Sequence, residues 1–171
     1  MVLDAFRIRG SQACPPQAGI QVVWRSITPC AFGKGLAVKE DEIKNVLTHC
    51  KTVAIVGISP KLDRPSYIVS AFLQAKGYRI IPVRPDGEEI LGEKVYHTLT
   101  DIPIGVEIDV VDIFRKPEDV PPIIEEAIQR GAKVIWMQEG IVHPEAGSRA
   151  EKAGLKVVMD RCMKKEYQRL R

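Results

Sequence analysis

The sequence predicts an α/β fold, a three-layer, Rossmann-like, doubly wound parallel sheet of about five strands. From Lys39 onward, short runs rich in Val and Ile alternate with stretches whose apolar residues recur at helical spacing. Such runs are typical of parallel strands covered on both faces. A glycine also stands just beyond three of the helical stretches, at Gly77, Gly131 and Gly154, and a strand begins at once. These tight returns imply right-handed crossovers.

The strands are expected at 52–56, 79–83, 108–114, 133–137 and 156–159. Helices are expected at 40–48, from Pro65 to just before Gly77, at 120–128, at 144–153, and from Met163 to the end of the chain. Prolines in first turns, such as Pro65, suit helix starts because those positions need no amide donor. We expect the strand order 3-2-1-4-5, counted along the chain. This order places a topological switch, and therefore a ligand site, beside the first strand.

Residues 1–37 differ from this regular pattern. Glycines and prolines punctuate them, and only 20–24 suits a short strand, so we expect a poorly ordered extension. It is either a targeting segment, bearing Arg and few acids, or an overlong reading frame whose true start lies near Val38. We favour the second because no amphipathic helical period is visible. The folded domain is expected over 38–171.

Composition excludes several classes of protein. The formal net charge of +3 comes from residues 1–37, which hold four basic residues and one acid, so the rest balances 21 basic against 21 acidic residues. A basic nucleic-acid-binding domain is therefore not indicated. No apolar stretch approaches the ~20 residues that span a bilayer. The four cysteines lack CxxC pairing and metal spacing, which favours a reduced, cytoplasmic protein.

The segment after the first strand has the order that a phosphate-binding loop requires. The strand ends at Gly57, a turn of small residues follows, and Arg64-Pro65-Ser66 opens a helix. Free amides at a helix N-terminus carry partial positive charge and favour an anion. The plainer alternative is an ordinary strand-to-helix turn that needs a glycine. We favour anion binding because Lys61 and Arg64 flank the amides.

The loop fails the dinucleotide fingerprint G-x-G-x-x-G, because Ser59 and Leu62 occupy the second and third glycine positions. An NAD site also requires an acid at the end of the second strand, to hold the ribose hydroxyls. Arg84 stands there instead, and its guanidinium suits a phosphate. The pattern therefore favours a nucleotide with an extra ribose phosphate, such as coenzyme A or NADP.

Five motifs in this order resemble the small CoA-binding domain proteins. They are Gly57-Ile-Ser-Pro, Pro82-Val-Arg-Pro, Asp112-Ile-Phe-Arg-Lys-Pro, Lys133-Val-Ile-Trp-Met-Gln-Glu-Gly and Arg161-Cys-Met-Lys-Lys-Glu. The chain looks like the CoA-binding domain of the succinyl-CoA synthetase alpha subunit standing alone, from about Lys39 to Arg171. The synthetase's phosphorylated histidine lies in a second domain that has no counterpart in this sequence.

The resemblance implies a role for each matching position. The CoA phosphates would be received by the loop residues Gly57, Ile58, Ser59, Pro60 and Lys61, with Arg64 and Ser66 at the helix start. The adenosine would be bordered by Val83, Arg84 and Pro85. The adenine and pantetheine path would be lined by Phe114, Arg115, Lys116 and Pro117. The pantetheine arm would reach Gln138, Glu139 and Gly140.

Arg84, Arg115 and Lys116 have the plainer alternative of solvated surface charges. Trp136 alternates with apolar residues in a strand, which favours packing over ligand contact.

His143 lies four residues after Glu139, but no nucleophile accompanies them, so we expect no catalytic role. Cys50 and Cys162 suit small buried side chains better than a thiol that forms a mixed disulfide with CoA.

The sequence thus predicts non-catalytic binding of coenzyme A or an acyl-CoA. Enzyme activity stays open, and we lean against it. One alternative is an NADP-dependent oxidoreductase, which Ser59 and Arg84 permit although no Tyr-x-x-x-Lys pair is visible. Another is a regulatory protein that responds to acyl-CoA. We expect no nucleic-acid or membrane partner and no metal, while a homodimer or a protein partner stays open.

Overall fold

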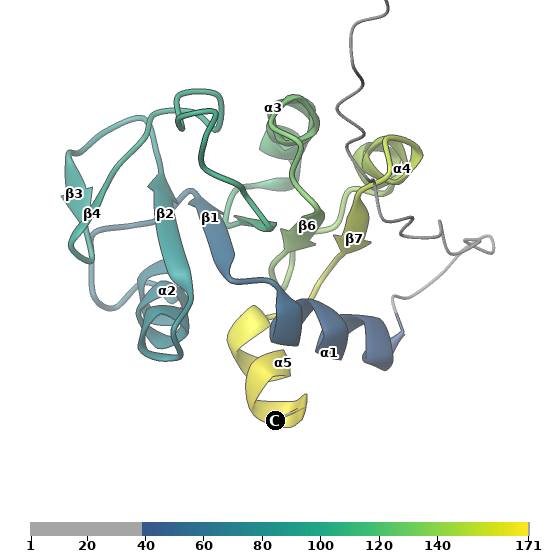
Figure 1. Cartoon of the computed structure of the whole chain (residues 1–171), viewed down its shortest axis with the longest axis horizontal. Coiled ribbons are helices and arrows are strands. Elements are labelled where there is room, and N and C mark those ends of the chain that lie inside the picture. Colours follow the sequence, from purple (N-terminus) through teal and green to yellow (C-terminus); the bar gives the residue numbers. More distant parts are fainter. Residues whose placement is uncertain (1–38, 171) are drawn as a thin grey trace, which may run out of the picture. The chain divides into compact units, whose positions relative to one another are not determined.

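The computed structural model describes residues 39–170, in which one five-stranded parallel sheet lies between two layers of helices (Figure 1). The strands of the sheet are β1 (Thr52–Val56), β2 (Arg79–Val83), β5 (Val110–Ile113), β6 (Val134–Met137) and β7 (Lys156–Val158). One face is covered by α1 (Glu40–His49), α2 (Pro65–Ala75) and α5 (Met163–Leu170). The other face carries α3 (Val120–Gln129) and α4 (Pro144–Lys152). The predicted α/β fold class is confirmed.

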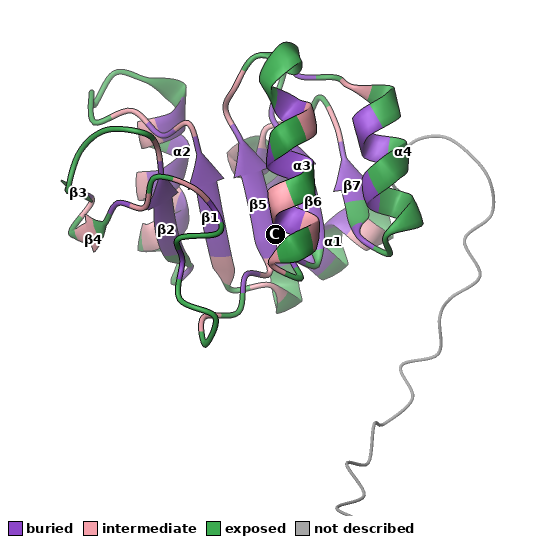
Figure 2. Ribbon diagram, turned by 90° about the horizontal axis from the view of Figure 1, so that it is seen from above, coloured by how far each residue is buried: buried purple, intermediate pink, exposed green. Residues whose placement is uncertain are grey.

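The strands are the most buried part of the domain (Figure 2). Every residue of β5 and β6 is buried, as the runs of Val and Ile indicate. Successive side chains of a strand point to opposite faces, so each strand contributes to two apolar cores. Ala54 and Val56 pack beneath α3 and α4, whereas Val53 and Ile55 pack against α1, α2 and α5.

The expected strand order was wrong in one respect. The sheet runs β2-β1-β5-β6-β7, so the third long strand pairs with β1 instead of lying outside β2. The chain between β2 and β5 contains no helix of its own. It places Leu99, Ile102 and Ile108 in the core shared with α3 and α4, so this segment covers the sheet as a helix otherwise would. The chain can therefore pass over β1 and form β5 on the side of β1 opposite to β2.

This order fixes where a ligand can bind. The chain moves from β1 to β2 in one direction across the sheet and then from β5 to β7 in the other. Right-handed crossovers therefore place α2 on one face and α3 and α4 on the opposite face. The loops after β1 and β5 diverge toward these two faces, which leaves a crevice at the carboxyl ends of the two strands. The switch beside the first strand, as the sequence predicted, lies between β1 and β5.

Most predicted elements agree with the structure to within one or two residues, but three short ones were missed. A 3-10 turn, η1 (Pro117–Asp119), precedes α3. β3 (Glu89–Ile90) and β4 (Glu93–Lys94) form an antiparallel hairpin. Its turn residues Leu91 and Gly92 both have positive φ, of 57° and 75°. The expectations for residues 1–37 lie outside the described residues. No helix within 39–170 is long and apolar enough to cross a membrane.

Candidate functional site

Gly57 makes the turn at the end of β1, and its backbone requires glycine for two reasons. Its φ is +88°, in the left-handed region that side chains disfavour. A Cβ atom there would also lie 2.9 Å from the Phe114 carbonyl oxygen and 3.0 Å from Nε of Arg115. The Gly57 amide donates to the Val83 carbonyl at 2.9 Å. Gly57 thus lets the loops after β1, β2 and β5 meet at one point.

The turn between β1 and α2 is held by two serines. The Ser59 amide donates to Oγ of Ser66 at 3.0 Å, and the Lys61 amide donates to Oγ of Ser59 at 3.2 Å. Pro65 occupies the first turn of α2, and no side chain caps this end of the helix. The amides at the start of α2 therefore carry partial positive charge toward the crevice, and Lys61 and Arg64 lie beside them.

Two clefts flank this turn. The first cleft has a volume of about 430 Å³ and is lined by Gly57, Ser59, Lys61, Arg64, Pro65, Ser66 and Phe114. The second cleft has a volume of about 340 Å³ and is lined by Gly57, Ile58, Ser59, Pro60, Lys61, Arg84, Pro85, Asp86 and Arg115. Volumes of this order are typical of small-molecule sites. The structure thus brings together most of the residues that the sequence assigned to phosphate and adenosine.

The backbone around Arg84 is held by the segment that follows β4. The Arg84 amide donates to the Tyr96 carbonyl at 2.9 Å, and the ring of His97 contacts the Pro85 carbonyl oxygen at 2.9 Å. The Arg84 side chain is 22% exposed, and its buried Nε has no hydrogen-bond partner within residues 39–170. A buried donor without a partner costs free energy. Arg84 is therefore better suited to hold an acceptor than a solvated surface arginine would be.

The residues after β6 lie apart from both clefts and are engaged elsewhere. Nε2 of Gln138 donates to both carboxylate oxygens of Asp112 at 2.9 Å. Glu139 forms a salt bridge with Lys165, and the Gly140 amide donates to Asp160 at 2.8 Å. Val83, Lys116 and Pro117 do not line the two clefts either. The roles expected for these residues stay predictions.

Asp112 is fully buried, and Gln138 is its side-chain partner. Burial raises the pKa of this carboxyl group to about 7, against the smaller opposing effects of hydrogen bonds from Gln138 and the Ile113 amide. Asp112 follows Val111 in β5, on the sheet face that carries α2 and α5. It is a structural carboxyl group close to the site and not part of either cleft.

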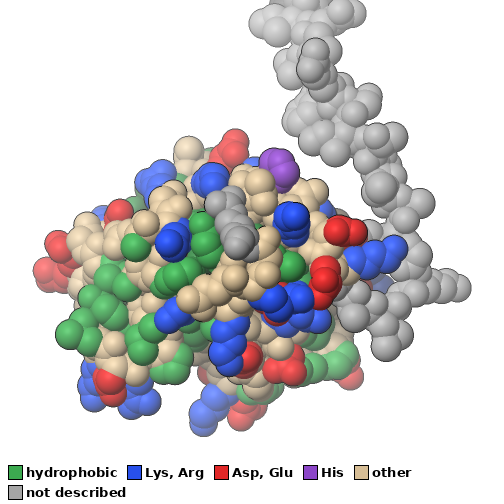
Figure 3. Space-filling view, turned by 90° about the horizontal axis from the view of Figure 1, so that it is seen from below, with side chains coloured by type: hydrophobic (Ala, Val, Ile, Leu, Met, Phe, Trp, Pro, Cys, Tyr) green, Lys and Arg blue, Asp and Glu red, His purple; other side chains and the backbone are tan. Residues whose placement is uncertain are grey.

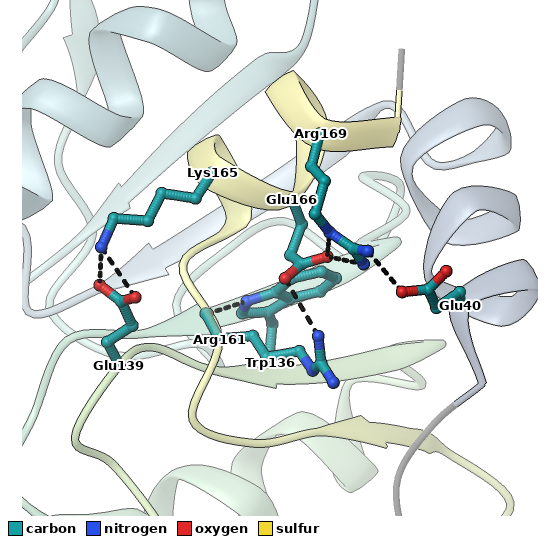
Figure 4. A network of polar contacts seen from close by, with 7 residues as sticks. All are labelled: Glu40, Trp136, Glu139, Arg161, Lys165, Glu166 and Arg169. Carbon is teal, nitrogen blue, oxygen red and sulfur yellow. Dashed lines mark hydrogen bonds and ion pairs between the residues drawn. The ribbon is translucent and has the colours of Figure 1, made fainter.

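Two residues that sequence analysis left uncertain have structural roles. Nδ1 of His143 accepts a hydrogen bond from the Ala146 amide at 3.2 Å and so caps α4. Trp136 is buried, and its indole N–H donates to the Arg161 carbonyl (Figure 4). Asp86, in contrast, lines the second cleft and was missed. Its only signal in the sequence was an acid two residues beyond Arg84.

A comparison with known proteins decides the family. Residues 51–168 match the family model described as CoA binding domain. The chain belongs to this family. This CoA-binding domain is 42% identical to the protein YneT of Bacillus subtilis (strain 168) over 123 residues, which are 72% of this chain and 90% of YneT.

A solved structure and a larger enzyme agree with this assignment. A hypothetical protein from Pyrococcus horikoshii OT3 is 43% identical, with a TM-score of 0.75, over 78% of this chain and 92% of its own. Acetate–CoA ligase II (ADP-forming) of Archaeoglobus fulgidus is 32% identical over 89 residues, which are 51% of this chain and 13% of the ligase. The CoA-binding domain is thus related to domains of ADP-forming acyl-CoA synthetases. The likeness to succinyl-CoA synthetase stays a prediction.

Proposed function

We propose that this protein binds coenzyme A or an acyl-CoA at the two clefts, without carrying out a reaction itself. The observation that carries the proposal is the uncapped start of α2 at the sheet's switch point, with Lys61 and Arg64 beside it. These two cations have no salt bridge within residues 39–170. Unpaired cations at a helix N-terminus favour a polyanion such as the pyrophosphate of CoA.

The clefts suggest how the ligand lies. The pyrophosphate would occupy the first cleft, against the amides at the uncapped start of α2. The adenosine would enter the second cleft, where Arg84 offers its guanidinium to the ribose phosphate. The pantetheine arm would leave past Phe114 and Arg115 toward Lys116, Pro117 and the turn after β6. Glu139 is half-exposed in that turn.

The proposal also holds that the protein catalyses no reaction, and the position of His143 supports this part. A general base must have a free nitrogen within hydrogen-bonding reach of the reacting group. Nδ1 of His143 instead accepts the Ala146 amide, so the ring is held at the start of α4. His143 does not line the two clefts.

Calorimetric titration with CoA, acetyl-CoA, NADH and NADPH tests the proposal. We expect saturable heat with CoA and acetyl-CoA and a matching rise in melting temperature, because a ligand that binds the folded state stabilises it. Heat with the nicotinamide cofactors alone would reject the proposed ligand and favour an NADP-dependent protein. Incubation of the protein with acetyl-CoA should release no free thiol. Steady release would show a reaction and reject the non-catalytic part.

A further inference from the structure

The second cleft contains one acidic residue among its basic ones. Lys61, Arg84 and Arg115 line it together with Asp86. A carboxylate near a bound phosphate repels it and weakens its binding. Asp86 therefore lowers the affinity of this cleft for a bare polyanion unless it contacts a different group of the ligand.

Asp86 and Arg84 are close to each other, but their side chains form no hydrogen bond with each other. The closest approach is 4.0 Å, from a terminal guanidinium nitrogen of Arg84 to a carboxylate oxygen of Asp86. This distance allows attraction but exceeds that of a hydrogen bond. The Asp86 side chain is 83% exposed, and Nε of Arg84 has no partner within the described residues. Both residues line the second cleft, so a ligand bound there can contact the outer guanidinium nitrogens of Arg84 and the carboxylate of Asp86.

The two side chains have opposite chemical requirements. An arginine offers donors only, in a fork that fits phosphate, whereas an ionised carboxylate offers acceptors only. Their neighbouring positions thus suit a ligand on which a phosphate lies next to a hydroxyl donor. A ribose with one of its two vicinal oxygens phosphorylated has this arrangement.

We infer that Arg84 and Asp86 together recognise an adenosine ribose that carries one phosphate and one free hydroxyl. Arg84 holds the phosphate, and Asp86 accepts the proton of the adjacent hydroxyl. The inference rests on the proposed function and adds a residue that selects the ligand. Two sources share this chemistry, the 3′-phosphate of CoA and the 2′-phosphate of NADP.

The test uses nucleotide fragments in calorimetric titrations of the full chain. Adenosine 3′,5′-bisphosphate, its 2′-deoxy analogue and adenosine 2′,5′-bisphosphate are compared on wild type and on Asp86→Ala. Glu88→Ala is the matched control, because it removes the same charge from an exposed position of the same loop that does not line the cleft. Both residues are exposed, so neither substitution should impair folding.

We expect wild type and Glu88→Ala to bind the 3′,5′-bisphosphate about tenfold more tightly than its 2′-deoxy analogue. Asp86→Ala should bind these two ligands equally. The inference would be overturned if Asp86→Ala bound the 3′,5′-bisphosphate more tightly than wild type does, or if Asp86→Ala still preferred it over the 2′-deoxy analogue. It would also be overturned if wild type bound the two ligands equally, or if wild type bound intact CoA but none of the fragments.

The fragments also separate this inference from the proposed function. Tighter binding of the 2′,5′-bisphosphate, with a loss in Asp86→Ala, would support the paired recognition while assigning the site to NADP. Binding of CoA by wild type without any effect of Asp86→Ala would retain the proposed function and reject the inference. A wild type that binds neither CoA nor any fragment would reject both.

Discussion

The charged side chains around α5 and those around the two clefts differ in how they are paired. In the first region three cations, Arg161, Lys165 and Arg169, each pair with a carboxylate (Figure 4). Lys165 pairs with Glu139, while Arg161 and Arg169 both pair with Glu166. At the clefts, Lys61, Arg64 and Arg115 have no salt bridge within residues 39–170, and Arg84 has only the distant Asp86.

The difference separates charges that link elements of the fold from charges that have no carboxylate partner within the described residues. Arg169 also contacts Glu40, so the network joins α5 to α1 across 129 residues of sequence. Acidic and basic side chains are interspersed on the face formed by α1, α2 and α5 (Figure 3). Paired surface charges of this kind contribute little stability each but fix geometry when they form a network. We propose that the unpaired cations at the carboxyl ends of the strands contribute to ligand affinity instead.

The largest expected effect comes from Asp112, a buried carboxyl group close to the clefts that has no salt bridge and accepts hydrogen bonds from Gln138. Its pKa is raised from 3.8 to about 7 by burial, so the unfolded chain ionises first as the pH rises. The free energy of unfolding therefore falls between about pH 4 and pH 7 and is constant above that range, with a total cost of about 4 kcal/mol. Asp112→Asn removes this cost. Urea unfolding should show a gain that grows from pH 4 to pH 7 and then stays constant.

Asp109→Asn is the matched control, three residues earlier in the chain. Burial raises the pKa of Asp109, but hydrogen bonds from Lys133 and from the Lys51 and Thr52 amides outweigh it and lower the pKa. Its ionised form thus stabilises the protein above about pH 4, and that contribution is lost as the pH falls through the lowered pKa. The Asn variant should be less stable at pH 7. A uniform gain for Asp112→Asn at all pH values would contradict the burial argument.

The second effect tests whether the clefts depend on the close approach of Phe114 and Arg115 to the backbone of Gly57. Gly57→Ala should lower the free energy of unfolding by about 3 kcal/mol, from a left-handed backbone and from overpacking against Phe114. It should also abolish CoA binding. Gly77→Ala is the control, because its φ is +86° but nothing lies within 4 Å of the added Cβ. Its loss should be about 1 kcal/mol, and CoA should still bind. Equal losses in the two variants would show that the contact is unimportant.

The third effect concerns Arg84, one of the basic residues that line the second cleft. Arg84→Ala should weaken CoA binding by about 2 kcal/mol, because a charged hydrogen bond to the ribose phosphate is lost. Dephospho-CoA, which lacks that phosphate, should be nearly unaffected. Arg79→Ala removes the same charge from the exposed first residue of β2, the strand that precedes Arg84, and should change the affinity for neither ligand. Equal weakening of both ligands by Arg84→Ala would remove Arg84 from the phosphate.

The comparison also shows what the sequence could predict. Local signals predicted the segments that line the two clefts: Gly57 ends an apolar strand, Pro65 begins a helix, and Arg84 follows a strand end. The strand order was not predictable from such signals, because Leu99 and Ile102 cover the sheet from a segment without helical period. Asp86 was missed for a related reason. Its place in the second cleft depends on how three loops converge, and an acid in a polar loop looks like a solvated residue.

The smallest effect lies in the α5 network and should leave the site untouched. Burial raises the pKa of Glu166, but hydrogen bonds from Arg169 and Arg161 outweigh it and lower the pKa. Glu166→Gln should therefore lower the free energy of unfolding by about 1 kcal/mol at pH 7, with a smaller loss at pH 4, while CoA affinity stays unchanged. Glu125→Gln, in the half-exposed pair with Arg149, should cost less. A weaker affinity for CoA in Glu166→Gln would instead show that the paired charges of α5 support ligand binding at the turn after β6, where Lys165 of the same helix holds Glu139.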